Sequence, residues 1–97
     1  MGKLWDEIRR LVAEEKYVVS EHAVERLEER GVLEWQVVIG LQEGQLMAER
    51  PRDEPSPVVE VRQRLVDDTE VKAVWAHLAR TGVAKLVTVH FFDEGEE

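Results

Sequence analysis

Residues 20–32 read Ser20-Glu21-His22-Ala23-Val24-Glu25-Arg26-Leu27-Glu28-Glu29-Arg30-Gly31-Val32, and they predict a short capped helix. Serine at the start can accept a hydrogen bond from the first turn, where acidic residues also suit the helix dipole. Glycine at position 31 can adopt the positive φ that ends a helix. At about 100° per residue, the buried stripe of this helix is expected to be Ala23, Val24 and Leu27.

The same helix sorts its charges onto two flanks. One flank carries His22, Arg26 and Arg30, whereas acidic residues gather on the other. Like charges at helical spacing oppose one another, so this flank indicates an anionic partner, and Arg26 is expected to reach solvent and to serve function more than stability. The alternative is that Glu29 or other acids compensate the flank, which is then an ordinary solvated surface.

Length and composition limit the class of protein. A chain of 97 residues can bury one core, so residues 1–92 are assigned to a single domain and residues 93–97 to an acidic tail that is expected to be disordered. No apolar run is long enough for a membrane span, and acidic residues near the amino terminus do not fit a signal peptide, so a cytoplasmic location is expected. The absence of cysteine excludes disulfides and thiolate catalysis.

The net charge of −8 is unfavourable for general nucleic-acid binding, which depends on contacts to phosphates. Removing the four acids of the tail still leaves about −4. Any binding of RNA therefore requires a local basic patch.

Periodicity along the chain predicts an α+β fold, with three N-terminal helices packed on one face of a three- to four-stranded antiparallel sheet. Residues 17–19 are β-prone and extended, and the third helix has a poor N-cap at Leu33 and a glycine suited to positive φ at Gly44. The helices are expected at 3–16, 20–31 and 34–43, a short strand at 45–49, and the main strands at 58–65, 70–80 and 83–92.

Pairing of the last two strands across Thr81-Gly82 determines which side chains share a face. An even-numbered loop puts one set of residues on the open face: Trp75, His77, Ala84, Leu86, Thr88 and His90. The opposite set is the more apolar and is the expected core: Val74, Ala76, Leu78, Val87, Val89 and Phe91. A three-residue loop would instead separate His77 from His90.

The pattern Ser20-x-His22-Ala23-x-x-Arg26-x-x-x-Arg30-Gly31-Val32, followed by Val37-Val38-x-x-Leu41-x-x-Gly44, resembles a small bacterial family, the domain of unknown function numbered four-two-five-eight. The layout of that family is distantly similar to the ribonuclease toxins of toxin–antitoxin pairs, in which helices precede an antiparallel sheet and RNA is cut on its open face. Two features depart from these patterns: the toxins are usually basic, and Leu33 stands where the family often has Ser or Thr.

If the toxin-like resemblance holds, the chain is a metal-independent endoribonuclease or an RNA-binding domain. Cleavage needs a base for the 2′-hydroxyl, an acid for the leaving oxygen and cations for the phosphorane. Histidine changes charge near neutral pH, so the candidate catalytic residues are His22 and His90. Arginine forks suit phosphate, so the candidate anion-binding residues are Arg26, Arg30, Arg62 and Arg64. No cofactor is expected, and the histidines lack the short spacings of a metal site.

A non-catalytic interaction domain is the other hypothesis, with binding through an acidic surface or a strand edge. The two hypotheses differ in where the basic flank points. A cleft shared with His90 favours the enzyme, and neutralisation by Glu29 or other acids favours the interaction domain. The partners considered are RNA, an antitoxin-like protein and a second copy of the chain, and no membrane partner is expected.

Overall fold

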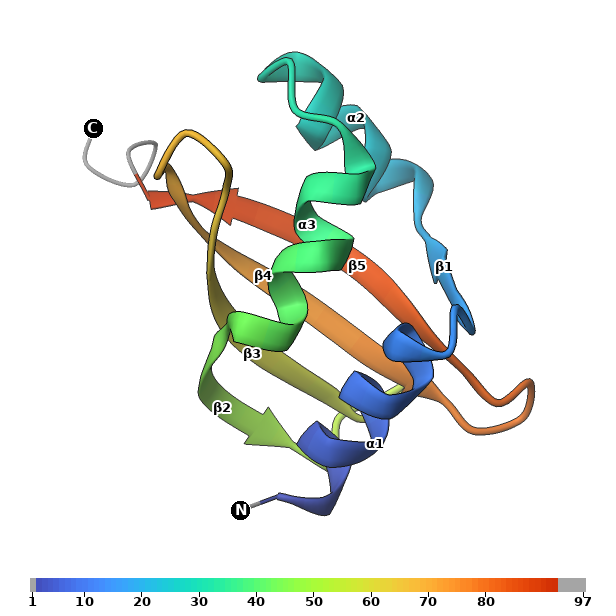
Figure 1. Ribbon diagram of the computed structural model, residues 1–97. Coiled ribbons are helices and arrows are strands. Elements are labelled where there is room, and N and C mark those ends of the chain that lie inside the picture. Colours follow the sequence, from blue (N-terminus) through green and yellow to red (C-terminus); the bar gives the residue numbers. More distant parts are fainter. Residues whose placement is uncertain (1, 93–97) are drawn as a thin grey trace.

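A computed structural model describes residues 2–92, so the predicted acidic tail at 93–97 lies outside the described residues. Three helices lie on one face of a five-stranded sheet (Figure 1). In chain order the elements are α1 (Lys3–Ala13), β1 (Tyr17–Val19), α2 (Glu21–Glu29), α3 (Glu34–Gly40), the 3-10 turn η1 (Leu41–Glu43), β2 (Gln45–Arg50), β3 (Val58–Arg64), β4 (Glu70–Leu78) and β5 (Val83–Phe91).

The helices follow from local signals that the sequence carries. The Oγ of Ser20 accepts a hydrogen bond from the amide of Ala23 at 3.0 Å, and Gly31 adopts a φ of 69° just after α2. Leu33 makes no side-chain cap for α3, as expected. Gly44 has a φ of −74° rather than the expected positive value. It is needed for space instead, because an added Cβ would lie 2.6 Å from Val61.

The sheet differs from the predicted three or four antiparallel strands. Its order is β1-β5-β4-β3-β2, and β1 pairs in parallel with β5 through the register Val19↔Leu86. Because β1 lies between α1 and α2 in the chain, the three helices do not precede the sheet as a block. The extended character of residues 17–19 was predicted, but a three-residue strand carries too little periodicity to reveal a distant partner.

The predicted face assignment is correct for one half of β5 and wrong for the other. The loop between β4 and β5 has an even length, since Leu78 pairs with Val83. The register then shifts between Val74 and Trp75, which leaves Val87 as an extra residue in β5. This bulge allows two sets of β5 residues to face the helices: Ala84 and Leu86 before it, and Val89 and Phe91 after it.

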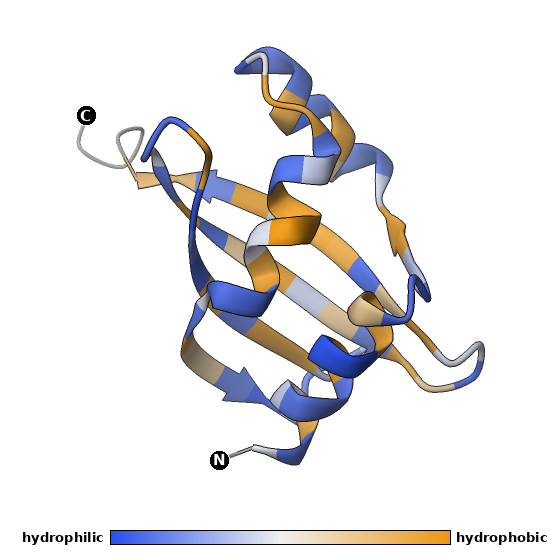
Figure 2. Cartoon of the chain, viewed as in Figure 1, coloured by the Kyte–Doolittle hydropathy of each residue, from blue (hydrophilic) through white to orange (hydrophobic). Residues whose placement is uncertain are grey.

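The core lies between the helices and this inner face of the sheet. Hydrophobic residues alternate with hydrophilic ones along each strand (Figure 2). Trp75 is fully buried there, contrary to its predicted place on the open face. Its indole Nε1 donates to Oε1 of Gln63 at 3.1 Å, and Nε2 of Gln63 donates to the carbonyl of Val37 at 2.8 Å. Gln63 therefore links β4, β3 and α3 through hydrogen bonds inside the core.

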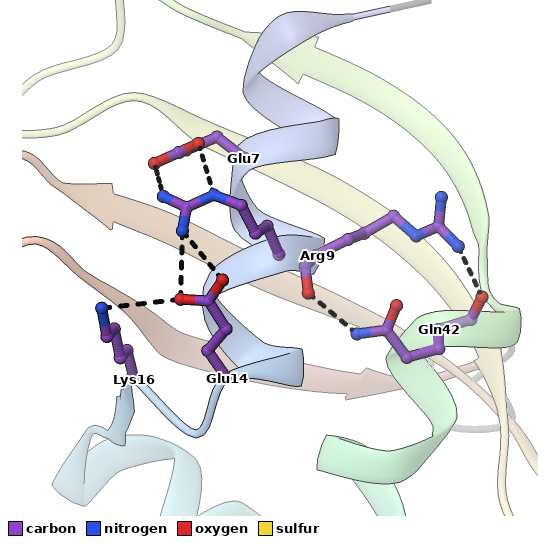
Figure 3. Close-up of polar contacts among 6 residues, drawn as sticks. Glu7, Arg9, Glu14, Lys16 and Gln42 are labelled. Atoms are coloured by element: carbon purple, nitrogen blue, oxygen red, sulfur yellow. Dashed lines mark hydrogen bonds and ion pairs between the residues drawn. The ribbon is translucent and has the colours of Figure 1, made fainter.

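The helix α1 is joined to the turn η1 by a reciprocal pair of hydrogen bonds (Figure 3). Arg9 donates through Nη2 to the carbonyl of Gln42 at 3.1 Å, and Gln42 donates through Nε2 to the carbonyl of Arg9 at 3.0 Å. On the exposed side of α1, Arg10 bonds to Glu7 and to Glu14. Within residues 2–92, α1 and the other helices are too short or too polar to cross a membrane.

Candidate functional site

An open groove of about 760 Å³ runs between α2 and the outer face of the sheet. Its walls come from α2, β4 and β5: His22, Arg26, Lys72, Val87, Thr88, His90, Phe91 and Phe92. Both candidate catalytic histidines and one candidate phosphate-binding arginine thus line a single groove. We call these eight residues the α2–β5 groove.

The two histidines reach the groove from different elements. His22 lies in the first turn of α2, and His90 lies on β5 between two buried residues, Val89 and Phe91, so it points to the open face. Both side chains are exposed, and within residues 2–92 neither has a hydrogen bond or ion pair to another described residue. The imidazoles are therefore accessible to a ligand in the groove.

Arg26 has a structural contact that the sequence did not predict. Its Nε donates to the carbonyl of Val89 at 3.3 Å, and its Nη1 lies 3.5 Å from a carboxylate oxygen of Glu29. The side chain is 23% exposed, so Arg26 is partly buried against β5 while it also lines the groove. The ion pair with Glu29 is the compensation that the alternative hypothesis requires.

Arg26 shares this edge of β5 with Ser20. Because β1 ends at the level of Leu86, the carbonyls of β5 beyond that point have no strand partner on this side. The backbone amide of Ser20 donates to the carbonyl of Leu86, and its Oγ donates to the carbonyl of Val87 at 2.7 Å. Ser20 and Arg26 together donate hydrogen bonds to these edge carbonyls of β5, and the bonds hold α2 beside the groove.

The other arginines lie around the groove rather than in it. The guanidinium of Arg30 stacks 4.2 Å from the ring centre of Phe91. Arg62 and Arg64 line a separate depression of about 240 Å³, where both lie within 4.0 Å of Glu70. Glu70 therefore offsets part of the charge that these two arginines were predicted to contribute.

Arg62 is nevertheless connected to the groove across the sheet. It pairs with Lys72 on β4, which pairs with His90 on β5, so the three side chains form one row on the open face. Arg62 also stacks 4.9 Å from the ring centre of Phe92, which lines the groove. The candidate anion-binding surface is thus a row from β3 to α2.

Lys72 and Phe92 are site residues that sequence reasoning missed. Lys72 lies between the buried residues Val71 and Ala73, and this alternation is the signal that could have placed it on the open face. Its Nζ lies 3.8 Å from a carboxylate oxygen of Glu60, which also bonds to Arg50 and raises the pKa of that arginine. Glu60 therefore flanks the row along β3.

His77 is far from the groove, at the hairpin end of β4, where it pairs with Ala84. The bulge at Val87 places His77 on the helix side of the sheet and His90 on the other side. The prediction that the two histidines share a face is therefore wrong. Among residues 2–92, no three His, Asp or Glu side chains gather in a way that could hold a metal ion.

A family model described as Domain of unknown function (DUF4258) matches residues 19–91. The chain belongs to this family. The matched segment begins just before the cap at Ser20 and ends at Phe91, so every groove residue except Phe92 lies in it, whereas α1 lies outside it. No curated protein and no solved structure matches the chain.

Proposed function

We propose that this chain is an RNA-binding domain that cleaves RNA without a metal ion, in the manner of a ribonuclease toxin. The observation that carries the proposal is that His22, Arg26 and His90, together with Lys72, line one groove although they come from three elements. Two imidazole side chains thus lie beside two cations. This set of side chains is what metal-independent cleavage of a phosphodiester requires.

In the proposed reaction, one histidine takes the proton of the 2′-hydroxyl, and that oxygen attacks the adjacent phosphorus. The bond from phosphorus to the 5′-oxygen breaks as the other histidine donates a proton to the leaving oxygen. The products are a 2′,3′-cyclic phosphate and a 5′-hydroxyl. Arg26 and Lys72 stabilise the charge on the non-bridging oxygens, and the assignment of base and acid between His22 and His90 stays open.

The apolar part of the groove suits single-stranded RNA. Phe92 lines the groove beneath Arg62, and an aromatic ring with an arginine beside it is a surface on which bases stack. Few phosphates can be contacted by so small a row, and the whole chain carries a net charge of −8. We therefore expect weak binding that decreases as salt rises, with a slope of about −1 to −2 in log K against log salt.

The test is incubation of RNA with the purified chain in the presence of a chelator. Wild type should produce cyclic-phosphate ends, and His22→Ala and His90→Ala should each lower the rate at least about 100-fold. His77→Ala is the matched control, because it removes a histidine outside the groove, and it should cut at the wild-type rate. Equal cleavage by all four proteins would show a contaminating nuclease and would contradict the proposal.

A binding assay separates RNA recognition from catalysis. Lys72→Ala should weaken the anisotropy signal of a labelled single-stranded RNA, whereas Lys16→Ala should not. The two changes remove the same charge, but Lys16 pairs with Glu14 and does not line the groove. If wild type binds RNA and does not cut it, the chain is an RNA-binding domain only.

The second candidate function is a non-catalytic protein-interaction domain. It is supported by the carboxylates that pair with the predicted cations: Glu29 with Arg26, and Glu70 with Arg62 and Arg64. The outer strand β2 also offers an edge for a partner strand. An antitoxin-like protein fits either function, and a homodimer fits the second. Wild type that neither binds nor cuts RNA would favour this function.

A further inference from the structure

From the outer face of α3 we infer that the chain binds a basic amphipathic helix of another protein. This inference does not depend on the proposed ribonuclease activity. Four apolar side chains on and next to α3 are at least half exposed: Leu33 at 60%, Trp35 at 50%, Ile39 at 64% and Val66 at 71%. Figure 2 shows hydrophobic segments along α3, and only part of them is buried in the core.

The shape of this surface suits a helix. Trp35 and Ile39 are four residues apart, so they form one ridge of α3. A groove of about 500 Å³ separates the ridge from Val12 and Tyr17, and a second groove of about 270 Å³ separates it from Val66. A ridge with a groove on each side is the surface against which a partner helix packs. We call this surface the α3 ridge.

The charges around the α3 ridge select the chemistry of the partner. Carboxylates lie in both grooves, Glu15 in the first and Glu43 in the second, and the exposed Glu34 precedes Trp35 in the chain. Within residues 2–92, none of these three has an ion pair to another described residue. The cation that lines the second groove is Arg64, which is held by Glu70. An apolar stripe with lysine or arginine at its margins therefore complements the ridge.

A second copy of this chain is a poor occupant of the same surface. Two α3 ridges placed face to face would oppose the carboxylates of both copies in a molecule whose net charge is −8. Like charges across an interface oppose association. A basic helix gains attraction from the same groups.

The experiment titrates the ¹⁵N-labelled chain with a synthetic Leu/Lys peptide of about 18 residues, or five helical turns, whose leucines form one stripe. A peptide of the same composition in scrambled order and a Leu/Glu peptide with the same stripe are the controls. The striped Leu/Lys peptide should shift the amide signals of Trp35, Ile39, Glu43 and Val66 and should bind at least about tenfold more tightly than either control. Equal binding of the scrambled peptide would show charge attraction only and would overturn the inference.

Variants on the exposed ridge make the result specific. Ile39→Ser should weaken binding of the striped peptide at least about tenfold, and Glu43→Lys about threefold. The matched controls, Met47→Ser and Glu54→Lys, change an exposed apolar residue and an exposed acid elsewhere and should leave the affinity unchanged. If Ile39→Ser has no effect, or if it abolishes a dimer of the free chain instead, the α3 ridge does not serve a basic partner. The RNA-cleavage assay should be unaffected by Ile39→Ser, so the two proposals can fail independently.

Discussion

Arg26 shows how one side chain of the charged flank serves the fold as well as the groove. The flank itself could be predicted from helical spacing, and the structure indeed places His22 and Arg26 in one groove with His90. The hydrogen bond from Arg26 to Val89 could not be predicted, because it depends on where β1 ends along β5. Helical spacing within α2 is enough to locate the charged flank. The partner of each charge depends on residues far away in the sequence.

Arg26→Ala should destabilise the fold by about 1 to 2 kcal/mol, because the variant loses a charged hydrogen bond to the Val89 carbonyl at the open edge of β5. This cost is larger than the value of about 0.5 to 1 kcal/mol expected of an arginine whose guanidinium reaches solvent freely. Urea melts measure the free energy of unfolding. Arg52→Ala, on the exposed loop after β2, is the control and should stay within about 0.5 kcal/mol of wild type. Equal stability of the two variants would show that the edge contact contributes nothing.

For Gln63, the sequence could predict the face of the sheet on which it lies but not its hydrogen-bond partners. Alternation along β3 puts it on the core side with Val61 and Leu65, but nothing local shows that its amide connects Trp75 to the carbonyl of Val37. Gln63→Leu should cost about 2 to 4 kcal/mol, because it leaves a buried donor and a buried acceptor without partners. Denaturant melts would measure this loss, with the exposed Gln45→Leu as the control. A variant as stable as wild type would mean that water or a rearranged core replaces both hydrogen bonds.

At the scale of elements, the sequence was most informative where the signals are local. The cap at Ser20, the glycine at Gly31 and the apolar stripe suffice to place α2, and alternation suffices to find β3, β4 and β5. The strand β1 was missed as a sheet member because its only evidence is pairing with a strand more than sixty residues away. The bulge at Val87 was missed because strict alternation assumes an uninterrupted ladder.

The exposed side of α1 gives a prediction on pH. The hydrogen bond from Arg10 to Glu7 lowers the pKa of that carboxyl from its ordinary value. A lowered pKa means that the charged pair stabilises α1 above the ordinary carboxyl range and that this stabilisation is lost as pH falls through the folded-state pKa. In an NMR titration, Arg10→Gln should raise the pKa of Glu7 toward its ordinary value, whereas Arg80→Gln at the hairpin end of β4 should not. An unchanged Glu7 titration in Arg10→Gln would contradict the assigned cause.

At the scale of the whole molecule, the distribution of charge separates the two functional surfaces. The net charge of −8 is spread unevenly: carboxylates border the α3 ridge, whereas cations form the row from Arg62 to Arg26. The sequence could supply the total and the charge on each element. It could not supply the juxtaposition of α2 with β5, which places the two histidines at one groove and is the basis of the proposed function.

The most direct measurement of that proposal is a map of amide chemical shifts in the ¹⁵N-labelled chain during titration with a short single-stranded RNA at low salt. The account predicts that the shifted signals belong to His22, Arg26, Lys72 and His90, and that they return to their free positions as salt is raised. Signals of the α3 ridge should stay in place and serve as the internal control. Shifts confined to the α3 ridge, or no shifts at any RNA concentration, would contradict the assignment of the α2–β5 groove to RNA.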